Sequence, residues 1–287
     1  MTGVQTCALP ISVGENAVVT VAGTLDVDST STATLNGRVR AVSGGLLAGA
    51  GADVSNGVTS DVTAGFGANA RIAARSILVN AGNVLEKPSV SGGNVKGGTG
   101  GLISGASASS VTTVSFDTKV DVGAGAVISG TGTEATAGEF VLAADNRIRA
   151  VDSVAFTTGG ALSGARAQSI VKTTQDKATV AVGTGARLTS PGDIEMSARG
   201  SGSVNVATNV ETYGVATVAT GNSVAEIRPV NLVTIGSGAL VAATGNVLVS
   251  TGTDTAFNRD AYALTARMDS FAGSVIPIDD IDSDATL

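Results

Sequence analysis

The chain has 287 residues, 39 of them glycine, with 3% aromatic and 14% charged residues and neither histidine nor tryptophan. Its formal net charge of −7 argues against binding to nucleic acid or to anionic membranes, since both need clustered lysine and arginine. Without histidine, a Ser-His-Asp or Cys-His catalytic arrangement and a His-ligated zinc site are excluded.

The first eleven residues differ in composition from the rest. They hold the only cysteine, Cys7, and they lack the basic and apolar regions of a signal peptide. We expect residues 1–11 to be a non-native segment, because they resemble the translation of a common sequencing adapter; the alternative is an ordinary N-terminal strand or frayed tail. Residues 12–287 then contain no cysteine, which fits export through an oxidising compartment but also a cysteine-free cytosolic protein.

A short phrase recurs along the chain. It occupies Val120–Ile128, Val180–Leu188 and Val233–Val241, and a looser copy with an insertion occupies Val62–Ile72. The starts at 120, 180 and 233 are 60 and 53 residues apart. A repeat of that size indicates a stacked array, because one unit cannot close a hydrophobic core alone.

The unit 180–232 shows how one repeat is built. Apolar and polar residues alternate at its start, which predicts a strand with one inward face. Gly183–Gly185 then supplies a turn, since glycine reaches positive φ without steric cost, and Ser190–Asp193 supplies another. Glu195 should face outward. The residues predicted to face inward are Val180, Val182, Leu188, Ile194 and Met196.

These patterns predict an all-β protein, a parallel β-helix (β-solenoid) built from repeats of 53–60 residues, with 12–287 as a single array. At about 20–25 residues per coil, each unit would cover two to three coils of short strands. The array would then be a rod of about 50–65 Å at a layer spacing of about 4.8 Å. The second half of each unit either lies in the coils or projects as hairpins, and an antiparallel β-sandwich is the alternative fold.

Two further segments bear on domain organisation. Glu86–Gly101 is rich in glycine and serine, and we expect a long loop between coils there, not a domain linker. After Val275–Ile278 the chain stops where the next copy of the phrase should begin. We therefore expect the array to be truncated at both ends. No apolar run reaches the roughly 18 residues of a transmembrane helix.

Two segments resemble calcium loops. Asp280–Asp284 places carboxylates at positions one, three and five, as an EF-hand loop does, but position six is Ala285 where that loop needs glycine. Ala48–Asp53 partly resembles the calcium nonapeptide of β-rolls, but it is a single copy and those sites need tandem copies. We expect both to be acidic turns that face water.

Other chemical motifs are weak. No Gly-Lys-Ser/Thr occurs, so there is no P-loop, and the Gly-x-Gly phrases lack the third glycine of a dinucleotide site. A Ser-x-x-Lys match at Ser169–Lys172 lies in alternating strand sequence. Asp145–Arg149 with Asp152 is the most compact mixed-charge cluster, and we expect solvated turn charges there, not a carbohydrate site. We predict no catalytic, cofactor-binding or metal-binding residues.

Residues 12–287 resemble the repeat region of large bacterial filamentous adhesins, in particular the leukotoxin-family filamentous adhesins and more loosely the filamentous haemagglutinins. The segments that carry this resemblance are Ile194–Thr220, Val233–Thr251, Arg259–Arg267 and Phe271–Ile278. The resemblance implies a non-catalytic stalk, extracellular or on the bacterial cell surface, exported by a type V-like route.

The partners that this resemblance implies are surface receptors or glycans of a host or of the environment, and an outer-membrane secretion partner for the full-length protein. It implies no nucleic acid, no cofactor and no membrane insertion of this segment. Two other functions stay open: a carbohydrate-active β-helix enzyme, and a structural protein of a biofilm matrix or surface layer.

Overall fold

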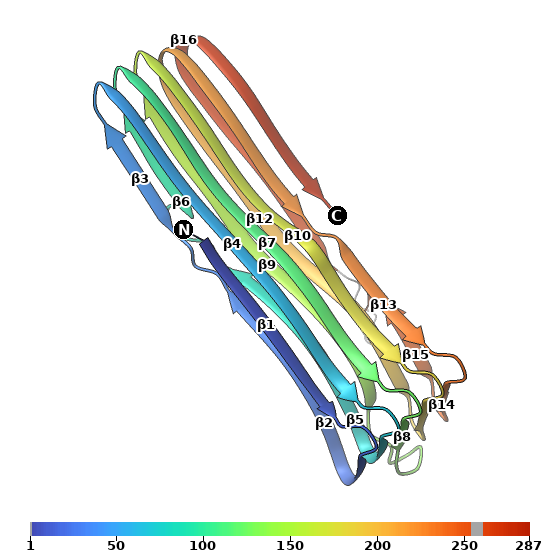
Figure 1. Cartoon of the computed structure of the whole chain (residues 1–287). Helices are drawn as coiled ribbons and strands as arrows, with labels where there is room; N and C mark the ends of the chain where they lie inside the picture. The colour runs from blue at the N-terminus through green and yellow to red at the C-terminus, as the bar shows by residue number, and fades with distance from the viewer. Residues whose placement is uncertain (1, 254–260) are drawn as a thin grey trace.

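The protein is an all-β parallel solenoid. The computed structural model describes residues 2–253 and 261–287, and every strand pair among them is parallel (Figure 1). This confirms the predicted fold class and excludes the antiparallel sandwich. Within the described residues, no helix is long and apolar enough to span a membrane.

Sixteen strands account for most of the described residues. They are β1 (Thr2–Val13), β2 (Val18–Thr34), β3 (Val39–Gly44), β4 (Leu47–Phe66), β5 (Arg71–Lys87), β6 (Val95–Gly100), β7 (Ile103–Val122), β8 (Val127–Gly130), β9 (Phe140–Gly159), β10 (Leu162–Val182), β11 (Arg187–Ser190), β12 (Ile194–Glu226), β13 (Pro229–Ile235), β14 (Leu240–Ala243), β15 (Val247–Thr251) and β16 (Tyr262–Thr286).

Each coil has two walls that face each other across the core. The front wall is a ladder of β1, β4, β7 and β10, continued by β13 and the second half of β12, with the second half of β16 outermost. The back wall holds β2, β3, β5, β6, β8, β9, β11, β14, β15 and the first halves of β12 and β16. The chain runs down the front wall, turns, and returns up the back wall (Figure 1).

One repeat makes one coil, so the prediction of two to three coils per repeat is wrong. Val120 pairs directly with Val180, and Val180 pairs directly with Val233. Strands of about 20 residues span about 65 Å, whereas five steps between front-wall strands rise only about 24 Å. The molecule is therefore a wide, flat stack and not a rod of short coils. The second half of each repeat lies in the coils and does not project as hairpins.

The strands are long because alternation continues through the glycine- and threonine-rich segments. In β7, burial alternates without a break from Ala108 to Val122. A parallel neighbour on each side satisfies the backbone donors and acceptors, so these segments need no turn of their own. The predicted inward residues of 180–232 are confirmed: Val180, Val182, Leu188, Ile194 and Met196 are all at most 2% exposed, and Glu195 lies on the outer face.

At the lower end of Figure 1, a four-residue turn joins the front wall to the back wall in every coil; we call this end the glycine edge. The five turns are 14–17, 67–70, 123–126, 183–186 and 236–239. The third residue of each has positive φ, namely Asn16 (57°), Asn69 (56°), Gly125 (68°), Gly185 (68°) and Gly238 (68°). The phrase thus has five copies. The predicted insertion in the looser copy is wrong, because Ala64 and not Val62 pairs with Val120.

The core is divided into three apolar clusters along the width of the stack. One lies next to the glycine edge and includes Val122, Val182 and Met196; a middle one includes Phe116 and Ile148. The third includes Phe156 and lies towards the opposite edge. Buried polar residues separate them. We call those between the first two clusters the lower polar band (Ser60, Asn83, Thr118, Asn146 and Asp176) and those between the last two the upper polar band (Lys87, Ser110, Thr112, Asp152, Ser169, Thr208 and Ser223).

The remaining domain-level expectations have mixed outcomes. Residues 2–13 form β1 and pair in register with β4, as an ordinary N-terminal strand does, and their proposed adapter origin stays a prediction. The loop expected over Glu86–Gly101 is shorter, because Lys87 ends β5 and Val95–Gly100 forms β6 within the back wall. Arg259, part of the adhesin-like segment, lies outside the described residues.

Candidate functional site

The mixed-charge cluster found in the sequence is split by strand alternation. Asp145 is outward on β9 and lies 3.3 Å from Arg199 of the next coil, both side chains being more than one-third exposed. Asn146 and Asp152 are inward and buried. Arg149 is exposed on the outer face. Asn146 and Asp152, which face the core, therefore cannot act on the same molecule as Asp145 and Arg149, which face solvent.

The two calcium-like segments are strands and not loops. Asp280, Asp282 and Asp284 lie in β16 and pair with Thr220, Asn222 and Val224 of β12, so their carboxylates are spread along an extended chain. Ala48–Asp53 lies within β4 in the same way. No group of three or more histidine, cysteine or acidic side chains that could hold a metal ion occurs in the part of the chain that the structure describes.

The Ser-x-x-Lys match also separates. Ser169 is fully buried, whereas Lys172 is exposed on the opposite face of β10. A serine nucleophile and its lysine base must be within hydrogen-bond reach of each other. Ser169 and Lys172 therefore cannot form such a pair.

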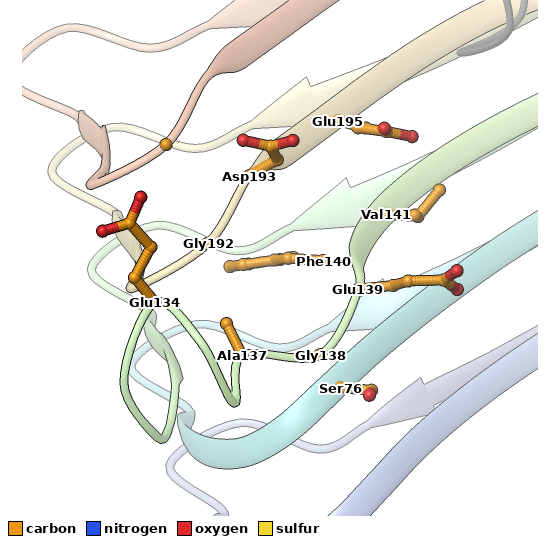
Figure 2. A pocket seen from close by; sticks show the side chains of 11 residues that line it. Ser76, Glu134, Ala137, Gly138, Glu139, Phe140, Val141, Gly192, Asp193 and Glu195 are labelled. Carbon is orange, nitrogen blue, oxygen red and sulfur yellow. The ribbon is translucent and has the colours of Figure 1, made fainter.

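A surface hollow lies beside the glycine edge, where residues 131–139 join β8 to β9 (Figure 2). Other coils need no loop or a shorter one at this place, such as residues 191–193 between β11 and β12. The longer loop bends back on itself, because the Thr133 amide donates a hydrogen bond to Thr136 Oγ1 at 2.9 Å. It leaves an open groove of about 650 Å³ between the layers.

The groove is acidic. Its carboxylates are Glu134, Glu139, Asp193 and Glu195, and they are spread around the rim without converging (Figure 2). Asp193 has a structural role, since its Oδ1 accepts a hydrogen bond from the Asn246 amide of the next coil at 2.6 Å. No histidine exists to act as a base, and Ser76 is the only hydroxyl residue that lines the groove.

A fully buried ion pair lies inside the core, in the upper polar band. Lys87 Nζ lies 2.8 Å from Asp152 Oδ1, and both side chains are fully buried. Lys87 also donates to Thr112 Oγ1 at 2.8 Å. Asp152 accepts from Ser110 at 2.8 Å and from Ser169 at 2.9 Å. Every partner is neutral or of opposite charge, which is what a buried ion pair needs.

This network connects strands of both walls and of three coils. Lys87 comes from β5, Asp152 from β9, Ser110 and Thr112 from β7, and Ser169 from β10. Because the group is sealed from solvent, no substrate can reach it, and its role is to fix the register of the coils. The buried lysine could have been predicted from the sequence. The alternation of inward and outward side chains from Leu85 places Lys87 inward, where a lysine without a partner would be costly.

The lower polar band is built in the same way from amide and hydroxyl groups and the Asp176 carboxylate. Asn83 donates to Thr118 Oγ1 at 2.7 Å, Thr118 in turn bonds to Asn146 Oδ1, and Asn146 donates to Asp176 Oδ1 at 2.8 Å. The chain of bonds again crosses between walls. Both bands therefore define the alignment of neighbouring coils.

Comparison of the chain with protein-family models, with curated proteins and with solved structures found no match.

Proposed function

We propose that the chain is a structural, non-catalytic segment of a large bacterial adhesin, secreted or displayed on the cell surface. The observation that supports this most is the repetition itself: five coils share one turn geometry, and buried polar bands run through them. An array of this kind is stiff because each coil is hydrogen-bonded to its neighbours along its whole width.

Because each coil is wide, such a segment would act through the area of its two walls more than through its length. Each coil adds only about 4.8 Å of length, so the array gains little reach per residue. It gains two broad walls instead, on which outward side chains recur from coil to coil. The front wall of β7, for example, presents Ser107, Ser109, Thr113 and Ser115 outward. Repeated weak contacts of that kind with glycans or receptors would add up by polyvalency.

The proposal is tested by measuring how glycan binding depends on the density at which the chain is displayed. Beads coated with the whole chain at increasing density are exposed to a panel of host and environmental glycans. We expect retention to rise more steeply than density, because several coils must engage together. Val182→Asp is the control, since it places an unpaired carboxylate at a site only 2% exposed and should disrupt the array.

Two results would contradict the proposal. If glycan retention is proportional to the density of the chain on the beads and saturates at one ligand per chain, the chain has a single binding site. Release of oligosaccharides from any polysaccharide in the panel would show an enzyme, and the acidic groove beside residues 131–139 would be the place to examine first.

A further inference from the structure

At the upper edge of the stack, each back-wall strand turns into the next front-wall strand (Figure 1). A row of large apolar side chains is exposed along this edge. The turns repeat a pattern of glycine or serine followed by two apolar residues. We call this row the apolar edge. Its exposed members are Leu46 (73%), Leu47 (72%), Leu102 (55%), Ile103 (46%), Leu162 (51%), Val215 (56%), Val275 (80%) and Ile276 (57%).

Pairing between coils places these residues in columns. Leu47 pairs with Ile103, Ile103 with Leu162, Leu162 with Ala216, and Ala216 with Ile276. The apolar edge is therefore continuous across five coils. The core does not require these residues to be apolar, because their side chains face away from it, and the turns at the glycine edge carry no large apolar residue.

The turn backbone does not offer a place for another strand. The Ile103 amide donates to Leu46 O at 3.1 Å, the Leu162 amide to Leu102 O at 3.1 Å, and the Val215 amide to Ala161 O at 3.0 Å. These donors and acceptors are used between coils. Any partner must therefore bind the edge through side chains, by apolar contact.

The apolar edge is also free of charge. Residues 43–49, 100–105, 159–164, 213–218 and 273–278 contain no Asp, Glu, Lys or Arg, although the whole chain has a net charge of −7. Two copies of this chain repel each other over most of their surfaces, but not here. An uncharged apolar row on an acidic molecule is thus the surface on which a second copy can approach.

The area fits a reversible association. At about 50 Å² of exposed apolar surface per residue, the eight residues present roughly 400 Å². Tyr213 and Phe271, whose rings lie 5.6 Å apart, flank the row on the back wall, and Val218 and Ile278 flank it on the front wall. With them, a pair of copies would bury about 1,200 Å², the lower end of specific interfaces.

We propose that two copies of this chain associate through their apolar edges. The two rows have the same spacing of about 4.8 Å between coils, so their side chains can interdigitate along the whole contact. This association goes beyond the proposed adhesin role, because it needs no receptor, and either could fail without the other.

The experiment is a concentration series of the whole chain by sedimentation velocity and small-angle X-ray scattering. Leu102→Glu/Leu162→Glu places carboxylates in two neighbouring coils of the edge. Val230→Glu/Leu240→Glu is the matched control, at outward residues 53% and 42% exposed that lie near the glycine edge. Leu102→Ser/Leu162→Ser is a milder second variant, and circular dichroism checks that each variant is folded.

We expect the wild type and the control to form dimers of about 130 Å in length, twice the strand span, at high concentration. The edge variants should have at least a ten-fold larger dissociation constant. A wild type that stays monomeric, folded edge variants that associate as the wild type does, or an associated state that grows along the stacking axis would each overturn the proposal. So would binding to phosphatidylcholine vesicles in place of self-association, since the edge would then be a lipid contact.

Discussion

Gly97 shows how a glycine can serve the core of a stacked coil. It lies inward on β6, and a Cβ built there would be 2.3 Å from Phe156 Cε2 of the next coil and 2.8 Å from Ala41 O. The large ring of one coil thus occupies the space that a side chain would need in its neighbour. Met268 fills the space beside Gly221 from the opposite wall, so a Cβ at Gly221 would overlap Met268 Cε.

We therefore expect Gly97→Ala to lower the free energy of unfolding by about 1–3 kcal/mol, the cost of overpacking a filled core. Gly100→Ala in the same strand is the control, because a Cβ there meets nothing within 4 Å. Urea denaturation of both variants measures the difference. Equal midpoints would show that Phe156 does not fill this space.

Lys87 and Asp152 form an ion pair that is fully buried in the core. Lys87→Met leaves the Asp152 carboxylate buried without its cation, and we expect a loss of about 3–5 kcal/mol of stability. Replacing both residues, as Lys87→Met with Asp152→Leu, should recover much of that loss, because no isolated charge stays in the core.

A double-mutant cycle in urea measures this coupling. Lys119→Met is the matched control, since the Lys119–Asp121 pair has a similar distance of 3.0 Å but side chains 40% and 43% exposed. Exposed pairs contribute about 0–1 kcal/mol. A Lys87 variant no less stable than the Lys119 variant would argue against a buried ion pair.

Among the elements, the turn at the glycine edge decides whether a coil can close. Its third residue has positive φ in every coil, yet it is asparagine in the first two coils and glycine in the last three. Asparagine and glycine are the residues that adopt this region most readily. The turn therefore requires a backbone conformation and not glycine as such.

Substitutions at Gly185 test whether the turn needs only the positive φ, because a Cβ there meets nothing within 4 Å. Gly185→Asn should leave the melting temperature nearly unchanged, whereas Gly185→Val should cost about 1–2 kcal/mol of backbone strain. Gly125→Asn is a useful comparison, since its Cβ would lie 2.5 Å from Asn69 Oδ1, the end of a side chain that can move aside, and it should cost little at the same φ. Similar losses for Asn and Val at position 185 would contradict the conformational argument.

For the whole molecule, the sequence predicts which residues face the core but not how wide a coil is. The alternation of apolar and polar residues along the strands was enough to predict that Val180, Leu188 and Met196 face inward. It did not reveal that Ser153–Gly159 is the last part of the long strand β9. Threonine and glycine favour bends when the hydrogen-bonding neighbours are unknown. The partnership of Lys87 with Asp152, 65 residues apart, likewise depends on a register between coils that local patterns do not contain.

Stability should vary with position in the stack, since each coil is supported by its neighbours. Inward residues of the central coils, such as Val182 and Met196, are at most 2% exposed, but their counterparts Ile235 and Val249 in the next coil are both 49% exposed. We expect backbone amides of β7, β9 and β10 to exchange with deuterium most slowly, and those of β13–β15 much faster, because they belong to a coil that opens at lower free energy. Hydrogen exchange with mass spectrometry measures this gradient. Uniform protection across all coils would instead mean that the stack unfolds as one unit, with no separate contribution from each layer.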